Sequence, residues 1–182
     1  MKRILLTAFA PFDQRATNQS YEIAKRIQSP AITLLQLPVT FHGAFEMLNA
    51  HLNTHSYDYI IALGEGPNRS LALEHVALNV MHARIPDTDG QQPVNEPIAP
   101  ASSLALTSEL PLPELSQLLD AKGLSYQHSY SAGTYVCNDL FYRMMHATWN
   151  TPRGFIHVPF EQDYEQPTLE ALQAVIDYLA SV

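Results

Sequence analysis

The stretch RILLTAF, residues 3–9, decides the fold, because it is the first of three apolar runs that alternate with two amphipathic runs. The other two apolar runs are AITLLQLPV, residues 31–39, and YDYIIALG, residues 57–64. Short apolar runs of this kind are typical of buried strands, and Gly64 is expected to end the third. The intervening segments, residues 18–27 and 43–52, place apolar side chains at helical spacing. Strand–helix–strand–helix–strand order predicts a largely parallel sheet with helices on both faces.

The second half of the chain is less regular. Residues 71–80, LALEHVALNV, alternate like one strand, and residues 82–100 form a long loop rich in Pro, Gly and Asp. We expect further strands at residues 125–131 and 154–160, and helices at residues 113–123, 137–147 and 167–182. With no repeat or linker visible, residues 1–182 are predicted to form one α/β domain. Its central sheet is expected to be twisted and mostly parallel or mixed.

Composition narrows the class of protein. The chain has 182 residues, of which 46% are hydrophobic and 15% charged, which is typical of a soluble globular domain. The net charge of -8 argues against a nucleic-acid partner, because phosphate binding normally requires a basic face. No segment reaches the length of about 20 apolar residues that a membrane helix needs. The single cysteine cannot form an internal disulfide, which favours a reducing compartment.

That single cysteine, Cys137, lies in SAGTYVCNDLFYRM, residues 131–144, at the start of a predicted helix. The free N–H groups and partial positive charge of a helix N-terminus favour a thiolate. The same N–H groups can stabilise a developing oxyanion. The plain alternative is a buried, inert thiol, because free cysteines often fill protein cores.

A carboxylate and a histidine complete the set needed for thiol catalysis. Glu74 shares one face of its predicted strand with Ala72 and Val76, where a carboxylate is costly unless it is paired. His157 lies near the end of the apolar strand GFIHVPF, residues 154–160. Together with Cys137 these residues could form a nucleophile, a general base and an orienting acid. The alternatives are a carboxylate that reaches water and a core histidine.

Other patterns give weaker signals. His51 and His55 have helical i, i+4 spacing, but no third ligand is apparent, so no metal site is predicted. GEGPNRS, residues 64–70, lacks the Gly-Lys-Ser/Thr ending of a phosphate loop and the glycine spacing of a dinucleotide site. A nucleotide ligand is therefore not expected.

Several segments, taken in order along nearly the whole chain, resemble the pyroglutamyl peptidase I family, also called pyrrolidone-carboxylate peptidases. TAFAPFDQRATNQS, at residues 7–20, is similar to the family's opening loop. LEHVALNVMHARIPDTDGQQPVNEPI, at residues 73–98, is similar to its acid-containing strand and long loop. SAGTYVCN is similar to the nucleophile motif and GFIHVPF to the histidine strand. The long second motif and AGTYVCN are specific to the family.

The resemblance implies roles for individual residues. Cys137 matches the nucleophile, His157 its general base and acid, and Glu74 the residue that orients His157. Arg84, in ARIPD, matches an arginine near the oxyanion. The positions that match the walls of the pyrrolidone pocket are Phe9, Phe12, Ile85, Tyr135 and Val136. Apolar walls suit a flat, uncharged lactam ring and would solvate a free charged amine poorly.

The resemblance also implies an overall function. It implies a cytoplasmic, cofactor-free cysteine exopeptidase that removes N-terminal pyroglutamate from peptides through an acyl-enzyme and that assembles as a homodimer or homotetramer. Nucleic acid and membranes are not expected partners.

The chain departs from the family pattern in two places. The family opening usually reads Thr-Gly-Phe-Glu-Pro-Phe-Gly-Gly, whereas this chain has TAFAPFDQ, so the loop could be stiffer or differently shaped. Glu65 stands where many members carry glutamine, although the alignment there needs a one-residue gap. If Glu65 faces the pocket, an acceptor-only carboxylate replaces an amide. The chain could then be an amidase for another cyclic or small N-acyl amide, or a non-catalytic binding homologue.

Overall fold

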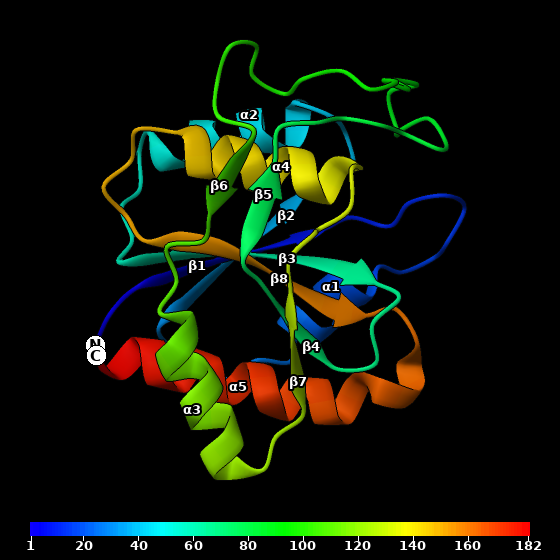
Figure 1. The fold of residues 1–182 in the computed structure, drawn as a ribbon. Helices are drawn as coiled ribbons and strands as arrows, with labels where there is room; N and C mark the ends of the chain where they lie inside the picture. The colour runs from blue at the N-terminus through cyan, green and yellow to red at the C-terminus, as the bar shows by residue number, and fades with distance from the viewer.

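A six-stranded mixed sheet forms the centre of the computed structural model, which describes residues 1–182 (Figure 1). The strands are arranged in the order β2-β1-β3-β8-β4-β7. Their bounds are β1 Ile4–Phe9, β2 Ile32–Leu37, β3 Tyr59–Gly66, β4 Leu71–Glu74, β7 Tyr126–Ser129 and β8 Arg153–Pro159. The first four strands in this order pair in parallel, β4 is antiparallel to β8, and β7 is parallel to β4. The predicted α/β class and mostly parallel sheet are confirmed.

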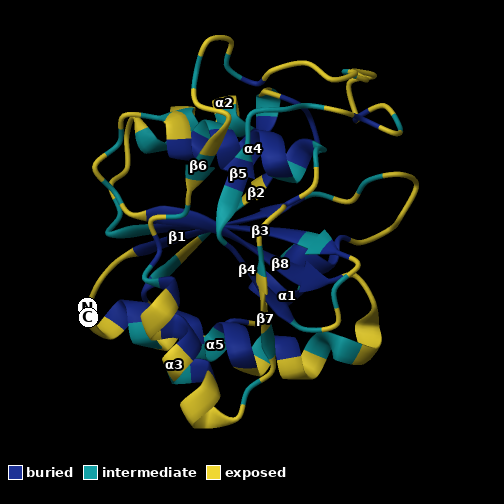
Figure 2. Cartoon of the chain, viewed as in Figure 1, coloured by how far each residue is buried: buried dark blue, intermediate teal, exposed yellow.

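Five helices cover the two faces of this sheet (Figure 1). They are α1 Gln19–Ala24, α2 Gly43–Leu52, α3 Leu112–Lys122, α4 Val136–His146 and α5 Glu165–Ser181, the last preceded by a 3-10 turn at Gln162–Tyr164. Helices α1, α3 and α5 share one apolar cluster with the sheet, and α2 and α4 share the other. Figure 2 shows the central strands and the inner helix faces buried between these layers, while the loops are largely exposed. None of the helices combines the length and the apolarity needed to cross a membrane.

Two expectations about the strands are wrong. Gly64 does not end β3, which continues to Gly66 beside β8. Residues 71–80 do not form one strand either, because the chain leaves the main sheet at His75. The N–H of His75 donates to Ser129 O and its carbonyl accepts from Ser108 N, so neither group continues the ladder with β8.

A second, two-stranded sheet takes over where β4 ends. Strand β5, Val76–Leu78, pairs antiparallel with β6, Ala105–Thr107, a strand that the sequence does not predict. Both strands lie over α4, on the side of the main sheet away from α5 (Figure 1). The main chain therefore turns from one layer to the next immediately after Glu74, which leaves Glu74, itself buried, in the last residue pair between β4 and β7.

Strand register brings distant residues together at one end of the sheet. Gly64 of β3 pairs with His157 of β8, and Ala72 of β4 pairs with the same histidine from the other side. Parallel strands direct their carboxyl ends to one edge, and α/β proteins bind ligands there. The candidate site lies at this edge.

Candidate active site

Cys137 is the second residue of α4 and is half-buried. The helix begins after Tyr135, so the first backbone N–H groups of α4 have no partner within the helix. The thiol packs against β3 at Gly64, where an added Cβ would lie 2.7 Å from Cys137 Sγ and 2.8 Å from Phe155 Cζ. A side chain at position 64 would displace the thiol, so glycine is required by this close approach rather than by a turn.

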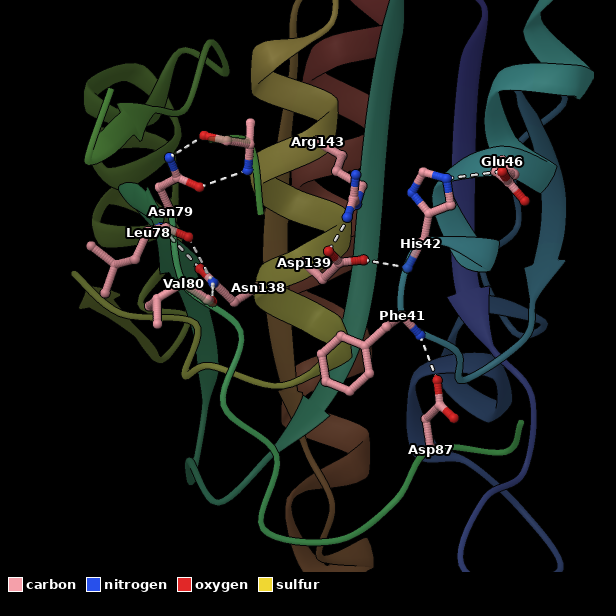
Figure 3. A network of polar contacts seen from close by, with 11 residues as sticks. Phe41, His42, Glu46, Leu78, Asn79, Val80, Asp87, Asn138, Asp139 and Arg143 are labelled. Carbon is pink, nitrogen blue, oxygen red and sulfur yellow. Dashed lines mark hydrogen bonds and ion pairs between the residues drawn. The ribbon is translucent and has the colours of Figure 1, made fainter. Parts of the chain in front are cut away.

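Asn138, the residue after Cys137, fixes the start of α4 against β5 (Figure 3). Its Oδ1 accepts from Leu78 N at 2.9 Å, and its Nδ2 donates to Leu78 O at 2.8 Å and Val80 O at 3.0 Å. The amide is fully buried, and these three bonds satisfy both ends of it. The backbone that carries the thiol is therefore held to the segment that follows Glu74.

Asp139 fixes the same helical turn against α2 (Figure 3). One carboxylate oxygen accepts from His42 N at 2.7 Å, and the other accepts from Arg143 Nε at 2.8 Å. Burial raises the pKa of Asp139, while the guanidinium of Arg143 and the bond from His42 oppose that shift. Cys137 is thus followed by two consecutive anchors that point to different parts of the fold.

His157 and Glu74 form a buried pair beside the thiol. Nδ1 of His157 lies 2.7 Å from Glu74 Oε1, and Cys137 lines the same pocket as these two residues. Burial by itself lowers the pKa of His157, but the hydrogen bonds and charges of Cys137 and Glu74 outweigh burial and raise it to about 10. The three residues predicted as nucleophile, base and acid therefore line one pocket, and His157 and Glu74 are hydrogen-bonded to each other.

An apolar pocket of about 410 Å³ opens on one side of Cys137. All six predicted substrate-binding residues and Arg84 line it: Phe9, Phe12, Glu65, Arg84, Ile85, Tyr135 and Val136. The Phe12 and Tyr135 rings lie 5.8 Å apart, and Tyr135 Oη donates to Pro86 O at 3.1 Å. Burial, with the charges of Asp87, Asp13 and Cys137, raises the pKa of Tyr135 to about 12, so its hydroxyl stays neutral.

Glu65 is the single acidic residue that lines the apolar pocket, and both of its oxygens already have partners. Oε2 accepts from Gln19 N at 2.6 Å, at the start of α1, and Oε1 forms an ion pair with Arg15 of the opening loop. The carboxylate thus ties the opening loop to the end of β3. In this loop Asp13 and Gln14 have φ angles of 54° and 60°, in the left-handed region that glycine adopts most easily.

Sequence reasoning missed four residues that line the apolar pocket: Asn18, Val39, His82 and Thr134. Asn18 also caps α1, since its Oδ1 accepts from Ser20 N at 3.1 Å. Thr134 Oγ1 donates to His82 O at 2.9 Å, which joins the nucleophile motif to the long loop. Asn18 and Thr134 both lie inside motifs that resemble the family. Their place in those motifs is the sequence signal that could have identified them as pocket residues.

A second, polar pocket of about 690 Å³ lies on the other side of Cys137. It shares Glu65, Tyr135 and Cys137 with the apolar pocket, and it alone reaches Glu74 and His157. Cys137 therefore stands between an apolar and a polar hollow, with its imidazole partner on the polar side.

The histidines at positions 51 and 55 lie away from both pockets. Their rings stack with centroids 4.3 Å apart, and His51 Nε2 hydrogen-bonds Tyr57 Oη at 2.8 Å. No group of three or more His, Cys, Asp or Glu side chains in residues 1–182 is arranged to hold a metal ion.

The sequence of this chain is similar to a known protein family and to individual proteins over most of its length. A family model described as pyroglutamyl peptidase matches residues 2–169. The pyrrolidone-carboxylate peptidase of Bacillus subtilis is 37% identical over 169 residues, covering 87% of this chain and 79% of that protein. The pyrrolidone-carboxylate peptidase of Gloeobacter violaceus is 36% identical over 199 residues, covering 98% of this chain and 97% of that protein.

Solved structures show the same similarity. The crystal structure of pyroglutamyl peptidase I from Bacillus amyloliquefaciens superimposes with a TM-score of 0.91 and 31% identity, covering 100% of this chain and 98% of that one. The pyrrolidone carboxyl peptidase from Thermococcus litoralis superimposes with a TM-score of 0.86 and 31% identity, covering 100% and 96%. The similarity thus extends over the full sheet and both helical layers.

Proposed function

Because this chain belongs to the pyroglutamyl peptidase family and is a cysteine peptidase by that membership, we propose that it removes N-terminal pyroglutamate from peptides through a thioester on Cys137. The observation that supports this most strongly is the buried, hydrogen-bonded pair His157–Glu74 in a pocket that Cys137 also lines, with an apolar pocket on the other side of the thiol. A nucleophile, a base and an orienting carboxylate in contact are the parts that covalent acyl transfer needs.

In the proposed reaction, the thiolate of Cys137 attacks the pyroglutamyl carbonyl carbon, and the carbonyl electron pair moves to oxygen. Unpaired N–H groups at the start of α4 and the guanidinium of Arg84 are available to stabilise that oxyanion. When the carbon–nitrogen bond breaks, the imidazolium of His157 gives its proton to the leaving amine. Water then attacks the thioester, His157 takes the water proton, and pyroglutamate leaves. The chain, substrate and water supply every proton and electron pair.

The apolar pocket suits the pyrrolidone ring. Its walls are largely aromatic and aliphatic, and Arg15 offsets the charge of Glu65, so an uncharged lactam would lose little by entering. A charged α-amine would lose its hydration without gaining a free carboxylate. This arrangement favours pyroglutamyl peptides over those with an ordinary N-terminus.

A direct test compares pyroglutamyl, prolyl and glutaminyl fluorogenic amides with the same leaving group. We expect turnover of the pyroglutamyl amide alone, because the prolyl and glutaminyl compounds carry a charged amine. Equal turnover of the prolyl amide would contradict lactam recognition. Turnover of a different cyclic or N-acyl amide would favour the amidase alternative, and binding of the pyroglutamyl amide without turnover would favour a non-catalytic homologue.

Glu74→Gln is expected to slow hydrolysis by about a hundredfold or more, because the amide orients the imidazole less well and no longer stabilises its positive charge. The same change is also expected to lower the pH at which kcat declines on the alkaline side. Glu74 is one of the groups that raise the pKa of His157 to about 10, so the protonated imidazole persists in the wild type up to that pH. Without the carboxylate, His157 loses its proton at lower pH, and the alkaline decline of kcat should move down.

The matched control for this variant is Glu161→Gln, which removes one negative charge from an exposed residue just beyond β8. Its rate and pH profile should equal those of the wild type. If Glu74→Gln keeps the wild-type alkaline limb while losing rate, the role assigned to the Glu74 carboxylate is wrong.

A further inference from the structure

The polar pocket contains one charged side chain that has no partner. Of its ionisable lining groups, Glu74 is bonded to His157, and Glu65 is paired with Arg15. Arg69, which lines the same pocket, makes no hydrogen bond or ion pair through its guanidinium with any group in the chain, and it is exposed. Arg69 is therefore the charged side chain of this pocket that is free to pair with a ligand.

The loop that carries Arg69 is fixed next to the catalytic strand. Asn68 Nδ2 donates to the carbonyl of His157 at 3.4 Å and also to Ser70 O. Earlier in the same loop, Gly66 O accepts from Phe160 N at 3.0 Å. The segment just before Arg69 is thus tied to His157 and to the residue that follows β8, which fixes the position of the Arg69 backbone relative to the imidazole.

The reaction chemistry determines which part of the substrate enters the polar pocket. This inference rests on the proposed function. The leaving amine must take its proton from His157, and His157 lines the polar pocket but not the apolar one. With the pyrrolidone ring in the apolar pocket, the amine and the residue attached to it extend into the polar pocket. The first residue after pyroglutamate therefore lies on the same side as Arg69.

We propose that Arg69 binds a carboxylate on the leaving residue and so gives the enzyme a preference for acidic leaving groups. Two sources supply this chemistry, the terminal carboxylate of a pyroglutamyl dipeptide and the side chain of an acidic first residue. A guanidinium binds either by charge-assisted hydrogen bonds. Because Arg69 is exposed, the preference is moderate and weakens at high salt.

The experiment measures KM and kcat of the wild type and Arg69→Gln on four substrates that form two pairs. Pyroglutamyl-alanine and its C-terminal amide differ in the terminal carboxylate. The amides of pyroglutamyl-glutamate and pyroglutamyl-glutamine differ in the side-chain charge. Lys122→Gln is the control, since it removes one exposed positive charge at the end of α3, far from both pockets and without an ion pair.

We expect Arg69→Gln to raise KM about threefold to fivefold for the charged member of at least one pair, with kcat and the neutral member unchanged. The affected pair identifies the source of the carboxylate. An equal effect on charged and neutral members, or no effect on any substrate, overturns the inference. Loss of the difference in high salt supports it.

Failure of the proposed function would be visible separately, as a wild type that hydrolyses none of the four compounds. In that case calorimetric titration of the wild type and Arg69→Gln with the glutamate and glutamine compounds decides the inference. Tighter binding of the glutamate compound that depends on Arg69 supports it, and equal affinities overturn it.

Discussion

Replacing Cys137 by serine is expected to reduce hydrolysis of a pyroglutamyl amide by about a thousandfold or more, while the protein folds normally. The imidazole that can accept a thiol proton is poorly matched to the far less acidic serine hydroxyl. Asn138 and Asp139 hold the start of α4 through their own bonds, so exchanging sulfur for oxygen leaves those anchors intact. Initial rates and thermal unfolding of both proteins check the two halves of this prediction.

Alkylation provides an independent form of the same test. Cys137 is the sole cysteine of the chain, so iodoacetamide should add one carboxamidomethyl group and abolish activity in proportion. Mass spectrometry gives the extent of modification in the same samples. Full activity after complete alkylation, or near wild-type turnover by the serine variant, would rule out a thiol nucleophile.

Replacing Arg153 by methionine is expected to cost about 3–5 kcal/mol in the free energy of unfolding. Arg153 is 2% exposed and is the first residue of β8. It donates to the carbonyls of Met144, Ala147, Trp149 and Thr151 at 2.6, 2.7, 2.8 and 2.9 Å. Methionine fills similar space but leaves these carbonyls without their side-chain donor. The segment between α4 and β8 therefore loses the hydrogen bonds that Arg153 makes to it.

Urea unfolding measures this loss, and Arg26→Met is the matched control. Arg26 is exposed and pairs with Glu165 on the surface, so its removal should change the free energy of unfolding by less than about 1 kcal/mol. Arg153→Lys should recover part of the loss, because one ammonium group can serve some but not all of the carbonyls. A methionine variant as stable as the control would contradict the assigned role of Arg153.

Local pattern was sufficient for most of the fold. The helix expected at residues 43–52 coincides with α2, and the helix expected at residues 113–123 overlaps α3, which ends at the left-handed Gly123. The wrong or missing predictions concern strands whose bounds are set by pairing with another strand and not by the local sequence pattern. Residues 71–80 alternate throughout, yet only a partner strand determines that β4 ends at Glu74. Strand β6 is three residues long, which is too short to give a periodic signal.

The same holds for the candidate site: the sequence indicates which residues belong to it but not how they lie relative to one another. The motifs indicate Cys137, Glu74 and His157, but the spacing of these residues along the chain contains no information on their relative placement. The register of β8 with β3 and β4 places His157 beside Glu74 in a pocket that Cys137 lines. Glu65 departs from the family pattern and is visible in the sequence for that reason. Nothing in the sequence connects it with its partner Arg15, which lies fifty positions earlier in an irregular loop.

The place of β8 in the sheet has a consequence for the order in which the molecule becomes active. This strand is the last to be synthesised, yet it lies between β3 and β4 and joins two otherwise separate halves of the sheet. Contacts between residues so distant in sequence form slowly, because a long loop must close first. The strand that completes the sheet also brings His157 to Glu74. A growing chain therefore contains Cys137 before β8 has placed His157 in the site, and we expect the proposed peptide cleavage to begin only when folding is complete.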